Sequence, residues 1–596
     1  GDVYKRQMYN WRDDRENRYR TRYRDLKLQD DGTYVGEIRR ETKGGIDNNR
    51  NKNTRLEDQR VLNFSLRGEH LLSTTLDMDW SVSYSKASED RPNERYIDFR
   101  QRKVTMGQSV ANDNSPYVYA VKGENPENFE LRKITENHNY TQEEEIGAKI
   151  NFRLPLSVID GEKGRLRFGA RMRLKDKKRD NIFYSYKPIN AMGSLAQMPN
   201  VYWSGENFYP GSQYAPGYFV DRKYLGNLDL YDPNLFKETL EPSEFLSSNY
   251  KAKENITAGY LRWDQDLDDK TSIITGIRLE HTAIEYTGNY VKDEEDLLGE
   301  IKNKNNYFNF LPSVTLKHKF TKNFILRAAV TTSLARPNYY NLAPYVNVIQ
   351  EDTEIKAGNP NLKATYATNF DIMVENYFKN IGIVSGGVFY KNLNNFIYTY
   401  NNKIYTANDF SADFPGVANP IPAGENWDFT QARNGDKVSV YGFEIAFQRQ
   451  LDFLPGNFFK NFGLYANYTY TKSDAKGITN EDGEKRTGLG LPRTAPHMLN
   501  GSLAWENKKF SARLSANYTS AYLDEIGGNE FEDSYYDKQF FLDYNMSYKF
   551  MSNWRVFFEA NNLTNQPLRY YQGETNRLQQ LEYYKSRFTL GIKYDF

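Results

Sequence analysis

Short turns and long connections alternate along most of this chain, and they join segments of alternating hydrophobicity. The paired segments are 59–69 with 75–85, 143–154 with 165–174, 255–265 with 271–286, 307–320 with 324–333, 365–378 with 381–400, 437–451 with 462–473, 497–506 with 509–520, and 539–550 with 554–562. Side chains alternate between the two faces of a strand, so each segment predicts a strand with one apolar and one polar face. Short turns at one end and long loops at the other are typical of a β-barrel in an outer membrane. A soluble propeller would show a fixed repeat, which we do not find.

The last segment, 581–596, predicts a strand that ends on an aromatic residue. Every second side chain is large and apolar: Phe588, Leu590, Ile592, Tyr594 and Phe596. The residues between them are small, polar or charged, so one face of this strand would meet lipid in a barrel. Such a strand resembles the assembly signal that the barrel insertion machinery of the outer membrane reads.

Composition favours a barrel over a large soluble domain. Aromatic residues make up 15% of the 596 residues, whereas hydrophobic residues reach only 39% and the mean hydropathy is −0.81. A barrel needs no large aliphatic core, because its apolar residues form a thin outer band. No run of about 18 apolar residues occurs, so we expect no membrane helix. The chain has no cysteine, and its net charge of +1 does not point to nucleic acid.

The chain opens without a signal peptide, although an outer-membrane protein needs one. Residues 1–7 read as the translation of a sequencing-library transposon end, so we expect an N-terminally truncated fragment. Residues 1–58 are then an N-terminal segment, in which this artefact precedes a partial barrel strand and a polar loop at 30–58. Residues 59–596 form the transmembrane β-barrel.

Several segments resemble the β-barrel portion of TonB-dependent outer-membrane receptors. They are the segments 336–345 (RPNYYNLAPY), 358–362 (GNPNL), 388–391 (VFYK), 441–444 (YGFE), 466–471 (ANYTYT) and 561–567 (NNLTNQP). No single motif is specific, and it is their order and spacing over residues 59–596 that carry the resemblance.

The resemblance implies an all-β fold, a transmembrane antiparallel barrel of about 22 strands around a plug, of which this chain holds most of the barrel and lacks the plug. It also implies a receptor in the outer membrane of a Gram-negative bacterium. Such a receptor imports a scarce nutrient, for example a glycan or a siderophore, with energy from the periplasmic protein TonB acting on the missing N-terminal part. The implied partners are outer-membrane lipid, the insertion machinery and a surface lipoprotein. A passive porin, or a barrel-anchored adhesin or binding protein, is the alternative.

No catalytic or metal-binding constellation stands out in the sequence. The five histidines, at 70, 138, 281, 318 and 497, lack the spacing of metal ligands. The acidic run at 293–296 lacks a surrounding glycine-turned ligand loop, so it predicts a solvated loop. We therefore expect no cofactor, no metal and no enzymatic activity.

Residues 200–224 hold a cluster of aromatic rings separated by proline and glycine. Our candidate ligand contacts from this loop are Trp203, Tyr209, Tyr214, Tyr218 and Phe219. A cluster of exposed rings marks a surface that something covers, and such rings suit stacking on sugars or other planar ligands. Packing of the rings on one another or on a plug, as a lid, is equally open. Arg336, Tyr339 and Tyr340 on a neighbouring loop could form the opposite wall.

A second candidate site is the run of alternating residues at 18–24. As a strand it places Arg18, Arg20, Arg22 and Arg24 on one face. In a lumen or at its rim, these guanidinium groups could pair with acidic residues of the plug or with an anionic ligand.

The alternation of connections also predicts the topology. We expect the turns near Asp268, Thr321, Lys508 and Ser552 at one end of the barrel. The loops around Trp203, Tyr339, 408–426 and Gly483 should lie at the other end.

Overall fold

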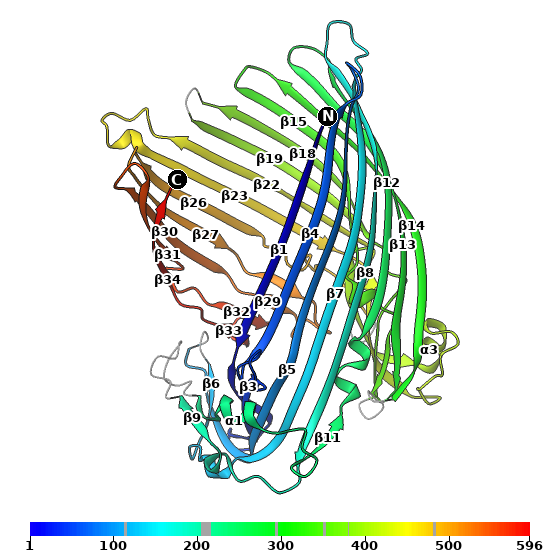
Figure 1. The fold of residues 1–596 in the computed structure, drawn as a ribbon, viewed down its shortest axis with the longest axis vertical. Helices are drawn as coiled ribbons and strands as arrows, with labels where there is room; N and C mark the ends of the chain where they lie inside the picture. Colours follow the sequence, from blue (N-terminus) through cyan, green and yellow to red (C-terminus); the bar gives the residue numbers. More distant parts are fainter. Residues whose placement is uncertain are drawn as a thin grey trace.

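One curved antiparallel sheet dominates the molecule (Figure 1). The computed structural model describes residues 1–112, 116–203, 216–292, 296–349, 353–378, 381–480 and 484–595. In order of pairing, the strands of the barrel wall are β1 (Asp2–Glu16), β4 (Arg55–Leu71), β5 (Asp77–Ser109), β7 (Glu130–Pro155), β8 (Gly164–Pro188), β12 (Tyr250–Asp266), β13 (Thr271–Lys292), β14 (Asp296–Lys319), β15 (Phe324–Ala335), β18 (Thr365–Tyr377), β19 (Gly382–Asn394), β22 (Lys437–Gln450), β23 (Phe462–Ala475), β26 (His497–Glu506), β27 (Phe510–Thr519), β30 (Gln539–Lys549), β31 (Trp554–Asn561) and β34 (Arg587–Tyr594). Among the described residues no pairing joins β1 to β34, so the wall is open there.

The predicted hairpins are confirmed, since each predicted pair of segments forms neighbouring antiparallel strands. One segment is shorter than expected. The segment 381–400 divides at Asn395, whose φ of 57° is left-handed and interrupts the strand. β19 ends before this residue, and β20 (Ile397–Thr406) pairs instead with β21 (Asn426–Asn434).

The polar stretch at 30–58 is not a continuous loop, contrary to our expectation. It contains β3 (Tyr34–Gly45), which pairs with β2 (Arg18–Leu28) on one side and with the far half of β5 on the other. β5 is 33 residues long, and its length provides a ladder for β3 beyond the end of β4. A strand outside the membrane needs no apolar face, which is why its composition reads as loop. The division of the chain at residue 59 stays a prediction, and β1, β2 and β3 lie before it in the same sheet.

Smaller elements lie in the long loops at one end of the wall, and β6, β9, β11 and α1 among them are seen at the bottom of Figure 1. The strands are β6 (Tyr117–Ala120), β9 (Asn200–Trp203), β10 (Gly217–Val220), β11 (Phe236–Leu240), β16 (Val346–Ile349), β17 (Glu354–Ala357), β24 (Ile478–Thr479), β25 (Lys485–Arg486), β28 (Tyr522–Glu525), β29 (Ser534–Tyr536), β32 (Leu568–Gln572) and β33 (Leu578–Glu582). The helices are α1 (Arg222–Asn227), α2 (Tyr339–Leu342), α3 (Ala407–Asp413) and short 3-10 turns at Pro126–Asn128, Leu195–Gln197, Pro242–Glu244 and Leu246–Ser248. One further 3-10 turn, Phe459–Asn461, lies in the connection of β22 to β23.

The two faces of the wall differ in chemistry. One face, which we call the apolar face, carries exposed aliphatic and aromatic side chains that meet in rows across strands. Phe558 of β31 lies opposite Leu590 of β34, and Val330 of β15 lies opposite Phe370 of β18. An exposed apolar band of this kind is what a bilayer-facing surface requires. β1 departs from the pattern, because its Lys5 and Gln7 share this face with Leu66 and Phe64 of β4.

The opposite face, which we call the polar face, is lined by ion pairs between neighbouring strands. Arg173 of β8 reaches Glu145 of β7 at 2.8 Å, and Arg327 of β15 reaches Glu375 of β18 at 2.9 Å. The two guanidinium forks fit their carboxylates with two hydrogen bonds each. Ion pairs of this kind join neighbouring strands on the polar face.

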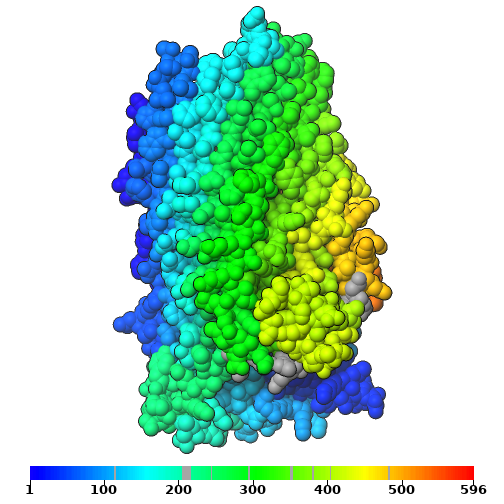
Figure 2. All heavy atoms as spheres, turned by 90° about the vertical axis from the view of Figure 1, so that its right-hand side faces the viewer, coloured from blue at the N-terminus to red at the C-terminus, as the bar shows by residue number. Residues whose placement is uncertain are grey.

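Apolar packing is concentrated in the long loops, where four separate clusters form. The largest joins Ile38, Ile97 and Phe99 of β3 and β5 to Leu225 and other residues of the segment 195–236. A second surrounds α3, which projects from the outer surface in Figure 2. Buried aliphatic side chains therefore serve mainly to anchor the long loops. No helix within the described ranges is long and apolar enough to cross a membrane.

The topology can be tested with single cysteines, because the chain has none of its own. Ala412→Cys lies in α3 among the long loops, and Ser552→Cys lies in the turn between β30 and β31. We expect a membrane-impermeant maleimide to label Ala412→Cys on intact cells and to label Ser552→Cys only after the outer membrane is opened. Labelling of both variants on intact cells would contradict the topology.

Candidate functional site

The arginines of β2 converge on one carboxylate. Arg18, Arg20 and Arg22 place a guanidinium nitrogen 3.2, 2.7 and 3.2 Å from the Glu41 carboxylate of β3. Glu41 is almost fully buried, whereas the three arginines are about one-third exposed. One carboxylate cannot neutralise three guanidinium groups, so this group of four residues, the arginine cluster, carries a net positive charge. Arg24 is exposed one step further along the strand.

The arginine cluster lies on the polar face. The polar face of β7 carries its odd-numbered residues, and the ladder of β7 with β8 runs without a register break. In β5 an extra residue near Asn93, with φ of 50°, shifts the register against β7 and exchanges the two faces of β5. Beyond this bulge Asp98 lies opposite Lys133, and Glu41 lies opposite Asp98. Glu41 and its arginines therefore share the face of Lys133.

This part of the polar face is positively charged. By register, β2, β3 and β5 contribute here the basic residues Arg18, Arg20, Arg22, Arg24, Arg39, Lys43 and Arg100 and the carboxylates Glu37, Glu41, Glu94 and Asp98. The excess of basic groups favours an anion. The Nε atoms of Arg18 and Arg20 are buried and have no hydrogen-bond partner within the part of the chain that the structure describes. Because they are buried, these two Nε atoms are not open to a ligand, although the side chains of Arg18 and Arg20 as a whole are about one-third exposed.

The loop that carries Arg336, Tyr339 and Tyr340 packs on the polar face of β12 and β13. Arg336 donates to Glu280 at 2.6 Å and to the Thr282 hydroxyl at 3.4 Å. The Tyr339 hydroxyl donates to Glu254 at 3.2 Å. Burial, followed by the nearby Glu254 carboxylate, raises the pKa of Tyr339 above its usual range, so the phenol stays protonated. The loop is thus fixed by charged partners.

Two lysines of β8 lie beside the ring of Tyr339 in this loop. The ammonium groups of Lys175 and Lys177 of β8 lie 5.3 and 5.1 Å from the centre of the Tyr339 ring. Both also pair with Glu143, at 2.7 and 3.3 Å. Tyr340 stacks on Tyr345 with ring centres 4.9 Å apart. We call Lys175, Lys177, Arg336, Tyr339 and Tyr340 the lysine–tyrosine wall.

The aromatic loop lies on the other side of the sheet. β9 and β10 form a two-stranded ribbon that packs on Tyr19, which alternates with the arginines and points away from them. The Tyr19 ring centre is 5.7 Å from that of Trp203 and 5.3 Å from that of Phe219. Trp203 and Tyr218 are partly exposed, whereas Phe219 is fully buried and is a packing residue. Tyr209 and Tyr214 lie outside the described residues.

We expected Arg336, Tyr339 and Tyr340 to form a wall opposite the aromatic loop, and the strand register does not support this arrangement. The aromatic ribbon continues the side of the apolar face, whereas Arg336 and Tyr339 lie on the polar face. Instead, the polar face carries the arginine cluster and the lysine–tyrosine wall. Sequence reasoning missed Glu41, Lys175 and Lys177. The alternation of Lys175 and Lys177 along β8 was a usable signal, whereas the contact of Glu41 with β2 needed the strand register.

Buried Arg95 holds the segment that follows β10 in the chain. Arg95 of β5 is 1% exposed and donates to the carbonyls of Leu225, Gly226 and Leu228 at the end of α1. It also pairs with Glu136 at 2.7 Å. Carbonyls at a helix end are unpaired within the helix and favour a cation. The loop is thus anchored to the wall by charge as well as by apolar packing.

The remaining sequence features have simple placements. Phe588, Leu590, Ile592 and Tyr594 lie exposed on the apolar face of β34, and Phe596 is outside the described residues. Positions 293–295 of the acidic run and Gly483 are likewise outside them. Across the described ranges, no group of three or more His, Cys, Asp or Glu side chains is arranged to hold a metal ion.

Comparison with protein families decides the identity of the chain. Residues 9–563 match the family model described as "TonB dependent receptor-like, beta-barrel". This chain belongs to the TonB-dependent receptor family. It is an outer-membrane receptor and transporter of a Gram-negative bacterium. The apolar face of this TonB-dependent receptor accordingly meets lipid, and its polar face lines the lumen.

Solved TonB-dependent receptors have the same fold at low sequence identity. The siderophore receptor PiuA from Acinetobacter baumannii is 13% identical, with a TM-score of 0.54 over 94% of this chain and 71% of that chain. The ferric-catecholate import receptor Fiu from K12 E. coli is 11% identical, with a TM-score of 0.55 over 99% and 81%. The ferric citrate transporter FecA is 11% identical, with a TM-score of 0.51 over 99% and 77%. No curated protein matches this receptor.

The lysine–tyrosine wall can be tested through Arg336→Ala. The substitution leaves Glu280 without one of its two arginine partners and removes a hydrogen bond to a charged group, which is worth about 1.5–3 kcal/mol. We expect faster hydrogen exchange at residues 336–349 by roughly tenfold or more. Lys356→Ala is the control, because Lys356 only pairs with Glu354 at the surface. Unchanged exchange in Arg336→Ala would show that the ion pair does not hold the loop.

Proposed function

We propose that this receptor imports an anionic nutrient, with a siderophore-type metal chelate as the first candidate. The observation that carries the proposal is the arginine cluster, in which three guanidinium groups share the single carboxylate of Glu41 on the lumen side. Arginine binds carboxylates and other planar anionic groups through two parallel hydrogen bonds, so an anionic ligand would supply the missing acceptors.

The ligands named for the solved relatives support this ligand class. These relatives are a siderophore receptor, a ferric-catecholate import receptor and a ferric citrate transporter. Catecholate and citrate groups are anionic oxygen donors and suit arginine and lysine. The lysine–tyrosine wall offers further cations beside an aromatic ring, so both parts of the lumen would attract such a ligand.

A glycan is the second candidate. The exposed rings of Trp203 and Tyr218 favour it, because flat rings stack on sugars. Tyr202 and Tyr218 also pair with ring centres 4.7 Å apart. These rings lie on the side of the sheet opposite the arginine cluster, so they would contact a glycan outside the lumen or a surface lipoprotein.

Uptake would be energised through TonB, acting on a plug that fills the barrel. The arginine cluster could then contact acidic plug residues as well as the ligand, since both present carboxylates. Import should therefore stop when the inner-membrane proton gradient collapses. Uptake that continues unchanged would favour a passive porin.

The ligand class can be tested with the double variant Arg20→Ala/Arg22→Ala in the complete receptor. Losing two charge-assisted contacts should weaken binding of ferric catecholate or ferric citrate by about tenfold or more, since a factor of ten is about 1.4 kcal/mol. Arg60→Ala is the matched control, because Arg60 pairs with Asp58 on the other side of the sheet. Binding of a neutral glycan should not change. Equal dissociation constants for wild type, the double variant and Arg60→Ala would show that the arginines do not bind the ligand and would leave contact with the plug as their role.

We also propose that β34 is the assembly signal. Its apolar side chains are among the most exposed of the wall, with Leu590 75% exposed. A charge on the lipid side costs up to about 2–4 kcal/mol for a basic residue at the bilayer midplane. Leu590→Lys should therefore lower the amount of heat-modifiable barrel in the membrane, whereas Lys593→Leu on the polar face should change it little. Equal membrane levels of Leu590→Lys and wild type would contradict the assignment.

A further inference from the structure

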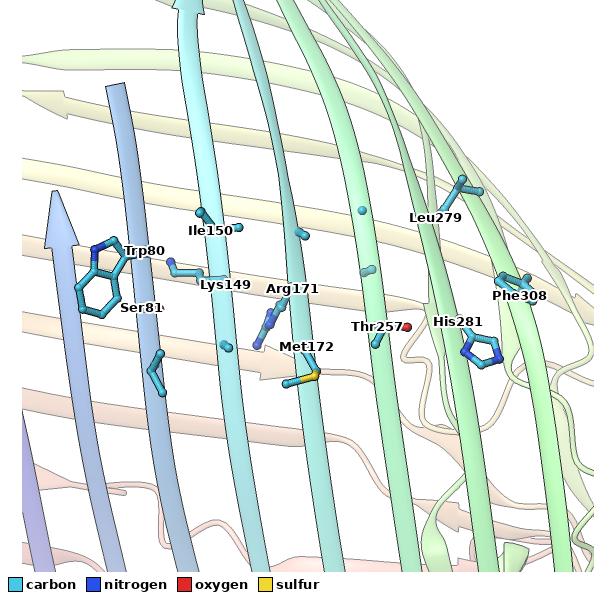
Figure 3. Close-up of a pocket in the computed structure, with 15 residues that line it drawn as sticks. Trp80, Ser81, Lys149, Ile150, Arg171, Met172, Thr257, Leu279, His281 and Phe308 are labelled. Atoms are coloured by element: carbon cyan, nitrogen blue, oxygen red, sulfur yellow. The ribbon is translucent and has the colours of Figure 1, made fainter. Parts of the chain in front are cut away.

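Two hollows on the outer side of the sheet differ in their chemistry. The first, shown in Figure 3, crosses the apolar face from Trp80 of β5 to Phe308 of β14, with small side chains such as Ala148 between them. It is open and mainly apolar, as a lipid-facing surface requires. The second lies outside the membrane, where the aromatic ribbon of β9 and β10 packs on β2 and β3.

We call the second hollow the tyrosine pocket. It has a volume of about 360 Å³, near the lower end of the range of small-molecule sites. Three parts of the chain line it: Tyr23 and Arg40 of β2 and β3, Glu124 and Phe129 of the connection from β6 to β7, and Tyr202 and Tyr218 of the ribbon. Tyr23 and Arg40 alternate along their strands with Arg22 and Glu41 of the arginine cluster, so the tyrosine pocket lies on the side of the sheet away from the lumen.

A buried ion pair lies at the base of the tyrosine pocket. The side chain of Arg40 is 3% exposed, and it donates hydrogen bonds to the Glu124 carboxylate and to the Thr21 hydroxyl. Arg40 and Glu124 are the only charged residues that line the pocket within the described ranges, and their charges cancel. The tyrosine pocket therefore favours a neutral polar ligand, whereas the arginine cluster on the lumen side favours an anion.

Two hydrogen-bonding groups in the tyrosine pocket are available to a ligand. Arg40 pairs with one oxygen of the Glu124 carboxylate, and the other oxygen has no partner among the residues that the structure describes. The Tyr23 hydroxyl also has none in this part of the chain. Burial, followed by the nearby Glu124 carboxylate, raises the pKa of Tyr23, so its phenol stays protonated. The pocket thus offers one acceptor and one hydroxyl donor.

The ribbon gives the tyrosine pocket an exposed aromatic wall. Tyr202 and Tyr218 are direct cross-strand partners and are 58% and 39% exposed. Their ring centres lie 4.7 Å apart, and their planes are tilted by 47°. Rings that face water in a group mark a surface that something covers. A sugar ring suits this wall, because its C–H face packs on aromatic rings while its hydroxyl groups reach polar partners.

The tyrosine pocket is preformed. The Thr21 hydroxyl, which accepts from Arg40, donates to the Pro216 carbonyl at 3.3 Å and so ties the ribbon to β2. Gly217 of β10 has a φ of 86°, and a Cβ there would lie 3.0 Å from the Nη2 atom of Arg40. Glycine therefore allows the ribbon to approach the ion pair closely. Walls that are already in place lower the entropic cost of binding.

We propose that the tyrosine pocket binds one neutral sugar ring of a glycan at the outer surface. The ring lies against Tyr202 and Tyr218, and its hydroxyl groups donate to the free oxygen of Glu124 and accept from the Tyr23 hydroxyl. The proposal rests on the glycan candidate of the proposed function for its ligand class. It concerns capture at the surface and not import through the lumen.

A side chain of a protein partner is the alternative occupant. An aromatic side chain would fill the same volume, but it would cover the free oxygen of Glu124 and the Tyr23 hydroxyl without bonding to them. An unpaired polar group that is buried costs free energy. A sugar satisfies both groups, so the pocket favours a glycan.

An array of neutral hexose oligosaccharides tests the tyrosine pocket with the complete receptor in detergent. The array also carries delipidated polysaccharide from the cells that make the receptor, which separates an external glycan from one of the cell's own surface. We expect wild type to bind, and Tyr202→Ala to bind about tenfold more weakly, because one stacking ring is lost. Tyr584→Ala is the matched control, since Tyr584 is 71% exposed in the connection of β33 to β34 and does not line the pocket.

A second variant removes a single hydroxyl group. Tyr23→Phe keeps the ring packed on the apolar cluster of β3 and β5, and it should weaken glycan binding by about fivefold through the lost hydrogen bond. Tyr34→Phe is its control, because the Tyr34 ring packs on the same cluster and does not line the tyrosine pocket. Heat modifiability identifies the folded barrels among these variants.

Three results would overturn the proposal. They are no binding of any neutral glycan by wild type, equal dissociation constants for wild type, Tyr202→Ala and Tyr23→Phe, and weaker co-purification of a surface lipoprotein with Tyr202→Ala at unchanged glycan affinity. Binding of ferric citrate should be unchanged in all four variants, because the arginine cluster lies on the other side of the sheet. This measurement separates a failure of the tyrosine pocket from a failure of the proposed anionic nutrient.

Discussion

The constraint on which this structure depends is the pairing of backbone groups in a medium without water. In the hydrocarbon region every N–H and C=O must find a partner within the protein, so strands can cross only side by side in a continuous ladder. From β1 to β34 each wall strand pairs with its neighbours, and long strands such as β5 and β13 continue the ladder beyond the membrane. Alternation of side chains then follows, because each strand must present one face to lipid and one to the lumen.

Outside the membrane the same ladder is put to a different use. The bulge at Asn93 exchanges the faces of β5, so that Ile97 and Phe99 turn to the outer side and pack under the segment 195–236. The same exchange brings Asp98 to the lumen side beside Glu41 and the arginine cluster. One extra residue thereby separates an apolar anchor for a loop from a charged surface for a ligand, within a single pair of strands.

The long loops are held by two kinds of interaction, ion pairs and hydrogen bonds on the lumen side and aromatic packing on the other side of the sheet. The lysine–tyrosine wall is held by Glu254, Glu280 and Glu143, so its cations are placed rigidly on the lumen side. The aromatic ribbon is held through Tyr19 and Phe219 on the other side of the sheet. A ligand entering the lumen and a partner touching the outside of the wall would therefore meet different residues.

The sequence by itself determined the hairpin strands from residue 59 onward, their pairing, and the placement of short turns and long loops at opposite ends, but it did not reveal β3. These features depend on local patterns, namely the alternation of apolar and polar residues along each strand and the length of each connection. Phe558 and Leu590 are examples of the apolar positions in that alternation. Only the tertiary structure decided which candidate residues share a surface. Trp203 and Arg336 both lie in aromatic loops, yet they lie on opposite sides of the sheet. The side taken by each loop is decided by where it returns to the wall and by a single bulged residue near Asn93, and neither leaves a periodic signal in the sequence.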